Sequence, residues 1–552
     1  MSHPQAADLV FTGGPVHTVD PARSSATGVA VRGGRIVAVG HDEVLDLVGT
    51  RTEVVDLAGR LLVPGFQDAH VHPQGAGLEL ALCHLGDTVD PQEYLRRVKA
   101  YADEHPDAEW ITGGGWSMEA FPGGTPTAAL LDAIVPDRPV FLPNRDHHGA
   151  WVNTRALQLA GIDARTPDPA DGRIERDADG NPTGTLQEGA VHVVGALVPD
   201  PTRAEQIAAL LRAQAVLHSY GVTAWQDAII GTYANMTDPS PAYHAAIADG
   251  LLTARVVGAL WWDRARGAEQ IPELIARREE LSRGRFRAGT VKIMQDGITE
   301  NHTAAMLDPY LTCCGCVSDN RGISFVEPDE LNRHVTALDA VGFQVHFHAL
   351  GDRAVREALN AVEAARAANG RRDTRHHLAH LQVVHPEDVP RFRSLGATAN
   401  LQALWAAHEP QMDELTLPFL GARRGTRQYP FGDLLRSGAT LAAGSDWPVS
   451  SPDPMAAIHV AVNRMAPDAP EGTQVFLPEQ RLDLGTAIAA YTAGSAHVNH
   501  LDDTTGSITT GRFADLVVLD RDPFAGPPAE IAATRVLQTF VEGRRVHAAS
   551  DA

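Results

Sequence analysis

Two histidines in an alternating pattern are the first residues whose types and spacing could do chemistry. His70 and His72 close the apolar run 61–72, which is typical of a strand. Because residues i and i+2 of a strand point to the same side, both imidazoles would face one space. Two imidazoles suit a divalent ion such as zinc. Alone, a His-X-His pair is a weak signal, since so short a match occurs often by chance.

The second candidate is a lysine. Only two of the 46 basic residues are lysines, Lys99 and Lys292. Lys99 lies in the amphipathic run 94–102 and needs no special role. Lys292 lies among apolar neighbours, where a bare ammonium is costly. A lysine can react with CO2 to give a carbamate that bridges two metal ions, whereas an always protonated arginine cannot. The alternative is a pairing with a buried carboxylate such as Asp296; we favour the carbamate.

Further residues of metal-ligand type lie in other apolar runs. His348, His380 and Asp446 each stand at or near the end of such a run. Any one histidine alone is better explained as a hydrogen-bonded core residue. A His-X-His pair, a lysine, two more histidines and an aspartate on five separate strands are hard to explain as independent accidents. The joint pattern therefore predicts one metal centre.

The elements that must position these residues alternate along the chain. Eight apolar runs are separated by helical stretches such as 204–220 and 352–369. Strands that are apolar almost throughout are typical of parallel strands buried on both faces. Eight of them favour a (β/α)8 TIM barrel over a doubly wound sheet, with polar residues gathered at the C-terminal mouth. The runs are 61–72, 221–230, 252–261, 290–297, 343–350, 375–384, 397–405 and 440–447.

Both ends of the chain differ from this pattern. They hold short strands with glycine turns, which predicts one small β-sandwich domain built from residues 1–60 and 490–552. The alternative, two independent flaps, would expose unpaired strand edges. The barrel would then span 61–489. The connection 73–220 is far longer than an ordinary loop, so we expect an inserted lid or substrate subdomain.

Composition and charge exclude several functions. The formal net charge is −23, which argues against nucleic acid and anionic membranes as partners. No run approaches the roughly 18 apolar residues of a membrane span, and residues 1–20 lack the pattern of a secretory signal. We expect a cytoplasmic protein that acts on a small molecule. Three of the four cysteines, Cys313, Cys314 and Cys316, lack a fourth thiol nearby, so we expect a loop with free thiols rather than a structural zinc site.

The pattern resembles the amidohydrolase superfamily over nearly the whole chain. The resemblance rests on segments 63–72, 221–223, 348–352, 444–446 and 511–519. Within the superfamily the chain is similar to the branch called amidohydrolase family 3, which includes the N-substituted formamide deformylases. The features shared with this branch lie in segments 146–153, 183–188 and 296–304.

The resemblance implies a ligand set. His70, His72 and Asp446 would hold a first ion. Carboxylated Lys292 would bridge this ion to a second one, which His348 and His380 would also hold. His346 should point inward like His348 and is a reserve candidate, whereas His376 should lie further from the mouth. At His380 the chain reads Leu-Ala-His where Ile-Glu-His is usual, which removes a carboxylate that orients the ring.

The expected reaction is hydrolysis of a carbon–nitrogen amide bond. One or two divalent ions, expected to be zinc, would lower the pKa of bound water from about 15.7 to near 7. The resulting hydroxide would attack the carbonyl, and Asp446 would move the proton to the leaving nitrogen. An N-substituted formamide or similar acyclic amide is the expected substrate. The alternatives are an ester, a cyclic amide or an amidine, or a non-catalytic barrel that only binds a small molecule; the resemblance also suggests a homodimer.

Residues of the insertion and loops should set specificity, although packing or loop capping explains each of them about as well. Aromatic walls would suit an apolar or aromatic substituent. The candidates for substrate contact are Trp116, Asp146, His148, Glu188, Glu300, Asn301, His302, Trp405 and Trp447.

Overall fold

The centre of the molecule is a barrel of eight parallel strands. The computed structural model describes residues 6–22, 24–233 and 236–550. Neighbouring barrel strands pair in chain order, which confirms the predicted TIM-barrel class. The strands are β8 (Phe66–Val71), β15 (Val222–Ile230), β16 (Arg255–Trp261), β17 (Phe286–Met294), β18 (Gln344–Ala349), β19 (His377–His380), β20 (Thr398–Leu401) and β21 (Thr440–Ala443).

Backbone hydrogen bonds join the first strand of the barrel to the segment that follows the last. The N–H of Asp446 donates to the carbonyl of His70 at 2.7 Å, and the N–H of His72 donates to the carbonyl of Trp447 at 2.9 Å. Both pairs lie at the C-terminal ends of the strands. The closure of the barrel therefore brings the first and last candidate ligands together.

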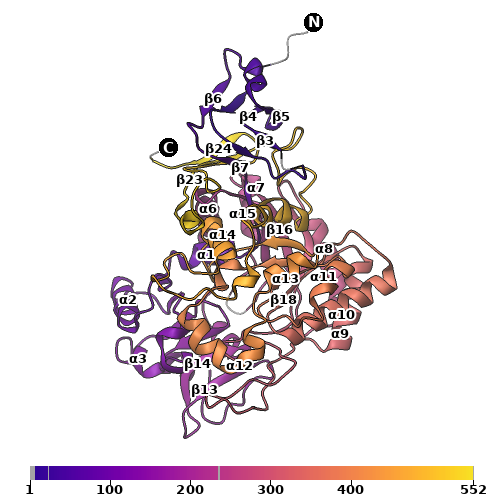
Figure 1. The fold of residues 1–552 in the computed structure, drawn as a ribbon. Helices are drawn as coiled ribbons and strands as arrows, with labels where there is room; N and C mark the ends of the chain where they lie inside the picture. Colours follow the sequence, from indigo (N-terminus) through magenta and orange to yellow (C-terminus); the bar gives the residue numbers. More distant parts are fainter. Residues whose placement is uncertain (1–5, 23, 234–235, 551–552) are drawn as a thin grey trace.

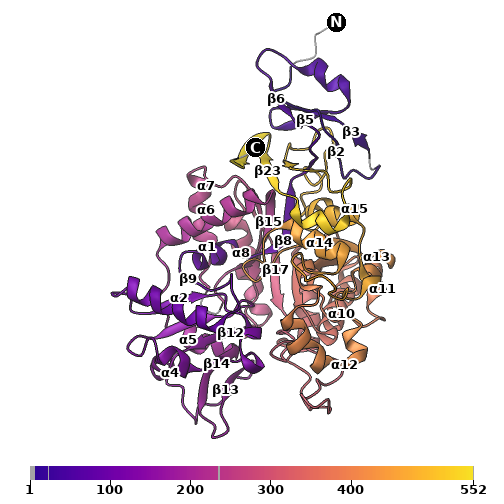
Figure 2. The ribbon, with the colours of Figure 1, turned by 60° about the vertical axis from the view of Figure 1, so that its left-hand side comes forward.

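Helices cover the outside of the barrel (Figures 1 and 2). Helices α7, α14 and α15 were not among the predicted ones. Helices α7 and α14 are apolar around most of their circumference, so they carry little of the 3.6-residue periodicity that marks a surface helix. The covering helices include α6 (Arg203–Ser219), α7 (Ser240–Ala248), α8 (Ile271–Leu281), α9 (Pro328–Ala340), α10 (Asp352–Asn369), α11 (Val389–Leu395), α13 (Phe431–Arg436), α14 (Pro454–Asn463) and α15 (Leu484–Ala489).

The insertion after β8 forms a mixed six-stranded sheet with its own core. Helix α6, which we placed inside the insertion, instead packs on the barrel through Leu210 and Leu217, so the insertion ends before residue 203. Helices α1 (Pro73–Glu79) and α2 (Pro91–Glu104) precede most of its strands. The sheet order is β13 (Gly172–Arg176), β14 (Pro182–Glu188), β12 (Gly149–Val152), β11 (Val140–Pro143), β10 (Ile111–Gly114) and β9 (Cys83–His84).

Strands from both ends of the chain pack together at the pole that carries both termini (Figure 1). Phe11 and Phe540 meet edge to face between the sheets, with ring centroids 5.0 Å apart. One sheet has the order β5 (Arg35–Gly40), β4 (Gly28–Arg32), β1 (Leu9–Thr12), β6 (Glu53–Asp56). The other has the order β24 (Arg544–Ala548), β23 (Val536–Val541), β22 (Leu516–Leu519), β7 (Leu62–Pro64), β2 (Val16–His17), β3 (Ser25–Ala26).

Residues 490–498 do not belong to these terminal sheets, contrary to the prediction. They form helical turns that end in α16 (Ser495–Val498). The Ser495 hydroxyl donates to the carbonyl of Ala443 at 2.9 Å, and Val498 packs against Ala69 of β8. Small side chains let these turns approach the barrel closely, so the segment caps the barrel instead of joining a sheet.

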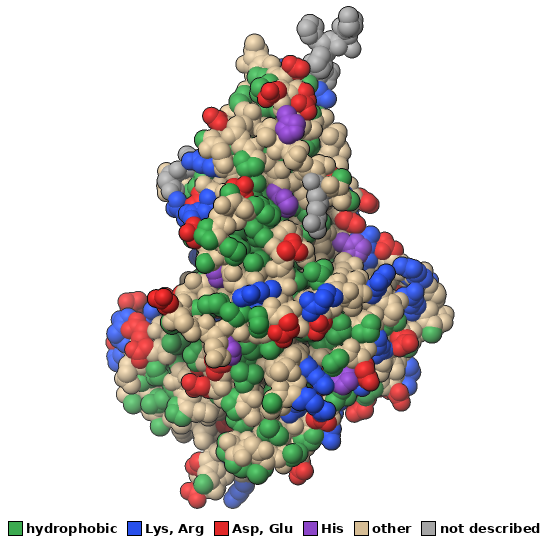
Figure 3. Space-filling model, in the orientation of Figure 1, with side chains coloured by type: hydrophobic (Ala, Val, Ile, Leu, Met, Phe, Trp, Pro, Cys, Tyr) green, Lys and Arg blue, Asp and Glu red, His purple; other side chains and the backbone are tan. Residues whose placement is uncertain are grey.

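Two features of the helices and the surface bear on the contacts expected from composition and charge. Among the described residues, no helix joins the length and the apolar character that crossing a bilayer requires. On the face drawn in Figure 3, acidic and basic side chains are interspersed instead of forming one basic field.

Candidate metal centre and active site

Three ligand-type side chains meet at the C-terminal mouth of the barrel. Asp446 Oδ1 lies 3.2 Å from His70 Nε2 and 3.1 Å from His72 Nε2. One ligand atom from each of these residues lies within 4.8 Å of the others. All three line a cavity of about 610 Å³, and Lys292, His348 and His380 line the same cavity. The structure thus brings all six residues predicted from the sequence to one place.

A buried carboxylate beneath the mouth positions His70 directly and positions Asp446 through its neighbour Ser445. Asp68 accepts a hydrogen bond from the N–H of His70 at 3.0 Å, and from the Ser445 N–H at 3.1 Å and hydroxyl at 2.5 Å. A Cβ at position 444 would lie 2.6 Å from the backbone nitrogen of His70, so only glycine fits there. Asp446 itself adopts a left-handed φ of 57°. The Gly-Ser-Asp sequence therefore lets the end of β21 pass close to β8.

A hydrogen-bond chain inside the barrel sets the tautomer of His70. The Gln344 amide N–H donates to the carbonyl of Val498 at 2.7 Å, so its oxygen accepts from Gln226 Nε2 at 3.3 Å. Gln226 Oε1 then accepts from Nδ1 of His346 at 2.6 Å. The remaining nitrogen of His346, Nε2, lies 2.9 Å from Nδ1 of His70 and must accept. His70 therefore carries its proton on Nδ1 and presents an unprotonated Nε2 to the mouth.

The unprotonated nitrogen is the observation that tests whether a cation fits. His70 Nε2 faces the carboxylate oxygen of Asp446 at 3.2 Å, and burial lowers the pKa of His70 to about 3. Two acceptors at that distance repel unless a cation lies between them. Moreover, both ring nitrogens of the buried His380 lack a hydrogen-bond partner among the described residues. Imidazole and carboxylate donors without protons suit a divalent metal ion.

Lys292 lies within this group of histidines. It is 2% exposed, and its Nζ is 3.5 Å from Nε2 of His70. Burial lowers the pKa of Lys292 to about 7, although Asp446 acts in the opposite direction. The alternative pairing with Asp296 does not occur. Asp296 instead accepts hydrogen bonds from backbone N–H groups, including that of Gly351 at 2.8 Å.

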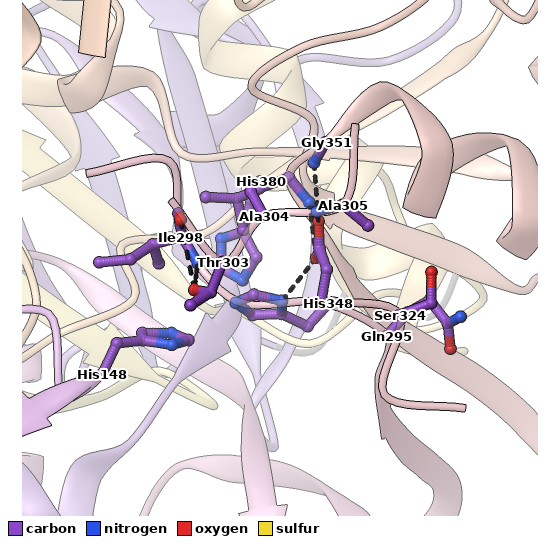
Figure 4. Close-up of polar contacts among 12 residues, drawn as sticks. His148, Gln295, Ile298, Thr303, Ala304, Ala305, Ser324, His348, Gly351 and His380 are labelled. Atoms are coloured by element: carbon purple, nitrogen blue, oxygen red, sulfur yellow. Dashed lines mark hydrogen bonds and ion pairs between the residues drawn. The ribbon is translucent and has the colours of Figure 1, made fainter. Parts of the chain in front are cut away.

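His348 and His380 lie side by side across the mouth (Figure 4). Their ring centroids are 4.5 Å apart. Nδ1 of His348 lies 3.2 Å from Asp296, which orients its ring. His380 has no such carboxylate: its ring stacks on Trp405 at 5.3 Å and its backbone adopts a φ of 81°. The absence of a carboxylate partner agrees with the alanine at position 379.

A charged pair stands above His348. His148 Nδ1 lies 3.0 Å from Glu188, and the His148 ring is 5.2 Å from that of His348. Burial alone would raise the pKa of Glu188, but His148 and hydrogen bonds from Thr303 and Asn301 outweigh it and lower the pKa to about 2. Burial likewise opposes the charge of His148, yet Glu188 raises its pKa. Glu188 thus favours the protonated form of the imidazole that faces the mouth.

Five of the other predicted substrate residues lie at or beside a second cavity. Asp146, Glu300, Trp405 and Trp447 line a second cavity of about 460 Å³, and Asn301 lies behind it beside Glu188.

Two predicted contacts are wrong. Trp116 is 1% exposed in the core of the insertion, where its indole N–H donates to the carbonyl of Leu142. His302 packs against Tyr310 and Phe419. Both side chains lie outside the two cavities. The sequence could not show this, because no periodic pattern indicates which way a loop side chain points.

Two histidines near the ligands have other roles. His346 points inward as predicted, but both of its nitrogens are used below the metal centre. His376 bonds Asp339 at 3.1 Å, away from the mouth. The exposed Cys314 and Cys316 are free thiols in a loop.

Three polar residues of the centre were not singled out from the sequence. They are Asp68, Gln226 and His377, of which the last donates from Nε2 to Gln226 at 3.0 Å. All three are buried in barrel strands. The signal that could have identified them is a polar residue within an otherwise apolar run, because a buried polar side chain normally needs a hydrogen-bond partner.

The geometry agrees with the comparison with known families. A model described as "Amidohydrolase family" matches residues 53–547. This chain belongs to the amidohydrolase family. The amidohydrolase is 27% identical over 573 residues to the N-substituted formamide deformylase of Arthrobacter pascens, with 98% of each chain covered. It is 30% identical to YtcJ of Bacillus subtilis, covering 98% of this chain and 99% of that protein. Protein LONG AFTER FAR-RED 3 of Arabidopsis thaliana is 31% identical, with 98% and 92% covered.

Solved structures agree with this assignment. An uncharacterized metal-dependent hydrolase from Pyrococcus horikoshii superposes on the amidohydrolase with a TM-score of 0.72 at 25% identity. The match covers 94% of this chain and 99% of that one. A similar hydrolase from Pyrococcus furiosus gives a TM-score of 0.68 at the same identity, with 93% and 99% covered.

Proposed function

We propose that this amidohydrolase uses a divalent metal centre, with zinc as the expected ion, to cleave the carbon–nitrogen bond of an acyclic amide such as an N-substituted formamide. The observation that carries the proposal is the distance of 3.2 Å between the Asp446 carboxylate and Nε2 of His70, a ring whose proton the hydrogen-bond chain places on Nδ1. The pair lies in a cavity large enough for a small molecule. The deformylase relative supports the choice of substrate class.

His70, His72 and Asp446 are the residues that would hold one ion. Lys292 as a carbamate would join His348 and His380 around a second. Bound ions of this kind lower the pKa of water from about 15.7 to near 7 and polarise a carbonyl. The buried Lys292 amine, with its lowered pKa, is suited to react with CO2 because only the neutral amine is nucleophilic.

Asp446 is the proposed base. Its Oδ2 lies 3.9 Å from His380 Nδ1, beyond a hydrogen bond, and the residue lines both cavities. The carboxylate can accept a proton from the attacking water and pass it to the leaving nitrogen.

His148 is the proposed oxyanion donor. Glu188 occupies its Nδ1, so the other ring nitrogen can donate to the oxygen of the substrate carbonyl as negative charge develops there.

The shape of the first cavity favours a substituted amide. Apolar side chains cover much of its wall, among them Leu78, Phe141, Val198 and Trp261. Such a wall excludes water and accommodates an apolar nitrogen substituent.

A panel of substrates tests the proposal. Zinc-loaded protein is incubated with N-substituted formamides, matched esters, cyclic amides and amidines, and the products are identified by mass. We expect amine release from the formamides, and loss of turnover after chelation. Turnover of only the esters or cyclic amides would contradict the proposed bond. Bound metal with no hydrolysis of any member would favour a binding protein.

A further inference from the structure

The second cavity is continuous with the candidate active site but has a different wall. The residues it shares with the first cavity include Glu79, Asp146, His148, His348, His380 and Asp446. Beyond the shared residues its wall carries further carboxyl groups and aromatic rings among aliphatic side chains. A substrate whose amide lies at the shared residues would therefore extend one part into this second space.

Carboxylates outnumber cations in the second cavity. Asp146, Glu300 and Glu409 line it together with Glu79 and Asp446, and Arg145 is the only arginine or lysine among the lining residues. Arg145 Nε lies 3.8 Å from Asp146, too far for a hydrogen bond, and the Arg145 guanidinium donates instead to Gln411 at 2.5 Å. Arg145 and His148 are fewer than the carboxyl groups of this wall, so a bound cation would meet more acceptors than like charges there.

Two polar groups in this wall lack partners in the described part of the chain. The Tyr429 side chain is 2% exposed and lines the cavity, yet its hydroxyl makes no hydrogen bond. Glu409 is partly exposed, and its carboxylate has neither a hydrogen bond nor an ion pair. Buried polar groups are normally paired, so the unpaired Tyr429 hydroxyl that faces the cavity indicates a ligand. The carboxylate accepts hydrogen bonds and the hydroxyl can accept one, so a ligand with N–H donors would satisfy both.

Aromatic rings complete the wall. Trp405 and Trp447 line the cavity together with Tyr429. Indole and phenol faces attract cations through their quadrupoles. Carboxylates and aromatic faces together favour an ammonium group, whereas a carboxylate ligand would meet Arg145 only among like charges.

We propose that the cavity lined by Glu300, Glu409 and Tyr429 is a subsite for a protonated amine, so that the preferred substrate is an amide bearing a cationic group. This inference rests on the proposed function, because it places the reacting amide at the shared residues. The amine would lie where it can donate to Glu409 and Glu300 beside the Trp405 ring.

Three matched formamides test the subsite in the zinc-loaded protein. The probes are N-(5-aminopentyl)formamide, neutral N-hexylformamide and anionic 6-formamidohexanoate. We expect kcat/KM for the cationic probe to exceed that of the neutral one at least about tenfold, with the anionic probe slowest. Glu409→Gln and Glu300→Gln should each reduce this preference several-fold, mainly by raising KM for the cationic probe more than KM for the neutral one. Glu414→Gln, on the exposed face of the helical turn Gln411–Thr416 that follows Glu409, removes the same charge and should change neither.

Amine binding without turnover separates this inference from the proposed function. Calorimetry measures the binding of 1,5-diaminopentane and of pentan-1-ol to zinc-loaded wild type and Glu409→Gln. Diamine binding that is weakened in Glu409→Gln supports the subsite even if no formamide is hydrolysed. Equal hydrolysis of the cationic and neutral probes, or diamine binding that Glu409→Gln leaves intact, overturns it.

Discussion

The Nε2 atom of His346 lies 2.9 Å from Nδ1 of His70, directly below the metal centre. Because Gln226 accepts from the other nitrogen of His346, this contact fixes the proton of His70 on Nδ1. The nitrogen left free is the one that faces Asp446. His346, which does not reach the mouth, thus sets the tautomer of His70, which does.

Replacing His346 with phenylalanine keeps the ring volume but removes the acceptor. The buried Nδ1–H of His70 would lose its partner, and outer partners of this kind typically contribute 10–100-fold to metal affinity. We expect zinc affinity to fall by about that factor in a competition titration with a chromogenic chelator. The exposed His41→Ala serves as the control. Unchanged affinity in a folded variant would show that His346 does not position His70.

Asp446→Asn should separate metal binding from proton transfer. The amide oxygen can still act as a ligand, but the amide cannot accept a proton. General acid–base groups contribute about 10²–10⁴-fold, so kcat should fall by that amount while metal content stays close to wild type. Turnover and metal content are measured on the same preparation. A wild-type rate in a metal-replete variant would remove Asp446 from the mechanism.

Lys292→Arg should remove the bridging carbamate. Arginine keeps the positive charge but cannot react with CO2. We expect activity to fall by more than roughly 100-fold, because loss of a metal ligand should cost more than loss of a residue that only hydrogen-bonds to a ligand. In the wild type, ¹³C-labelled bicarbonate should give a carbamate resonance that is absent from the variant. Lys99→Arg, at an exposed ion pair with Asp103, is the matched control. A wild-type rate in Lys292→Arg, or a wild type without the resonance, would exclude the modification.

The Glu188–His148 pair predicts a pH dependence of stability. The folded pKa of Glu188 is about 2, below its ordinary value of 4.5, so its stabilisation is complete above pH 4.5 and is lost as pH falls toward 2. The shift corresponds to about 3 kcal/mol. Glu188→Gln should therefore lower the melting temperature clearly at pH 7 and progressively less below pH 4.5. A difference that is constant from pH 7 to pH 3 would contradict an ionised, paired Glu188.

The barrel and the ligand positions follow from simple patterns. Strands buried on both faces give apolar runs, and the two-residue period places His70 and His72 on one side.

The supporting network could not be read from the sequence in the same way. Gln226 and His377 lie far apart in the chain, and only the closed barrel brings them below His70. Trp116 and residues 490–498 were misplaced because neither has a period that shows what it packs against.

The most direct test of the central claim is an anomalous-scattering crystal structure of zinc-loaded protein. We predict a peak bonded to Nε2 of His70, to His72 and to Asp446, with any second ion next to a carboxylated Lys292. Active protein with no peak at these residues, or with zinc bound elsewhere in the molecule, would contradict it.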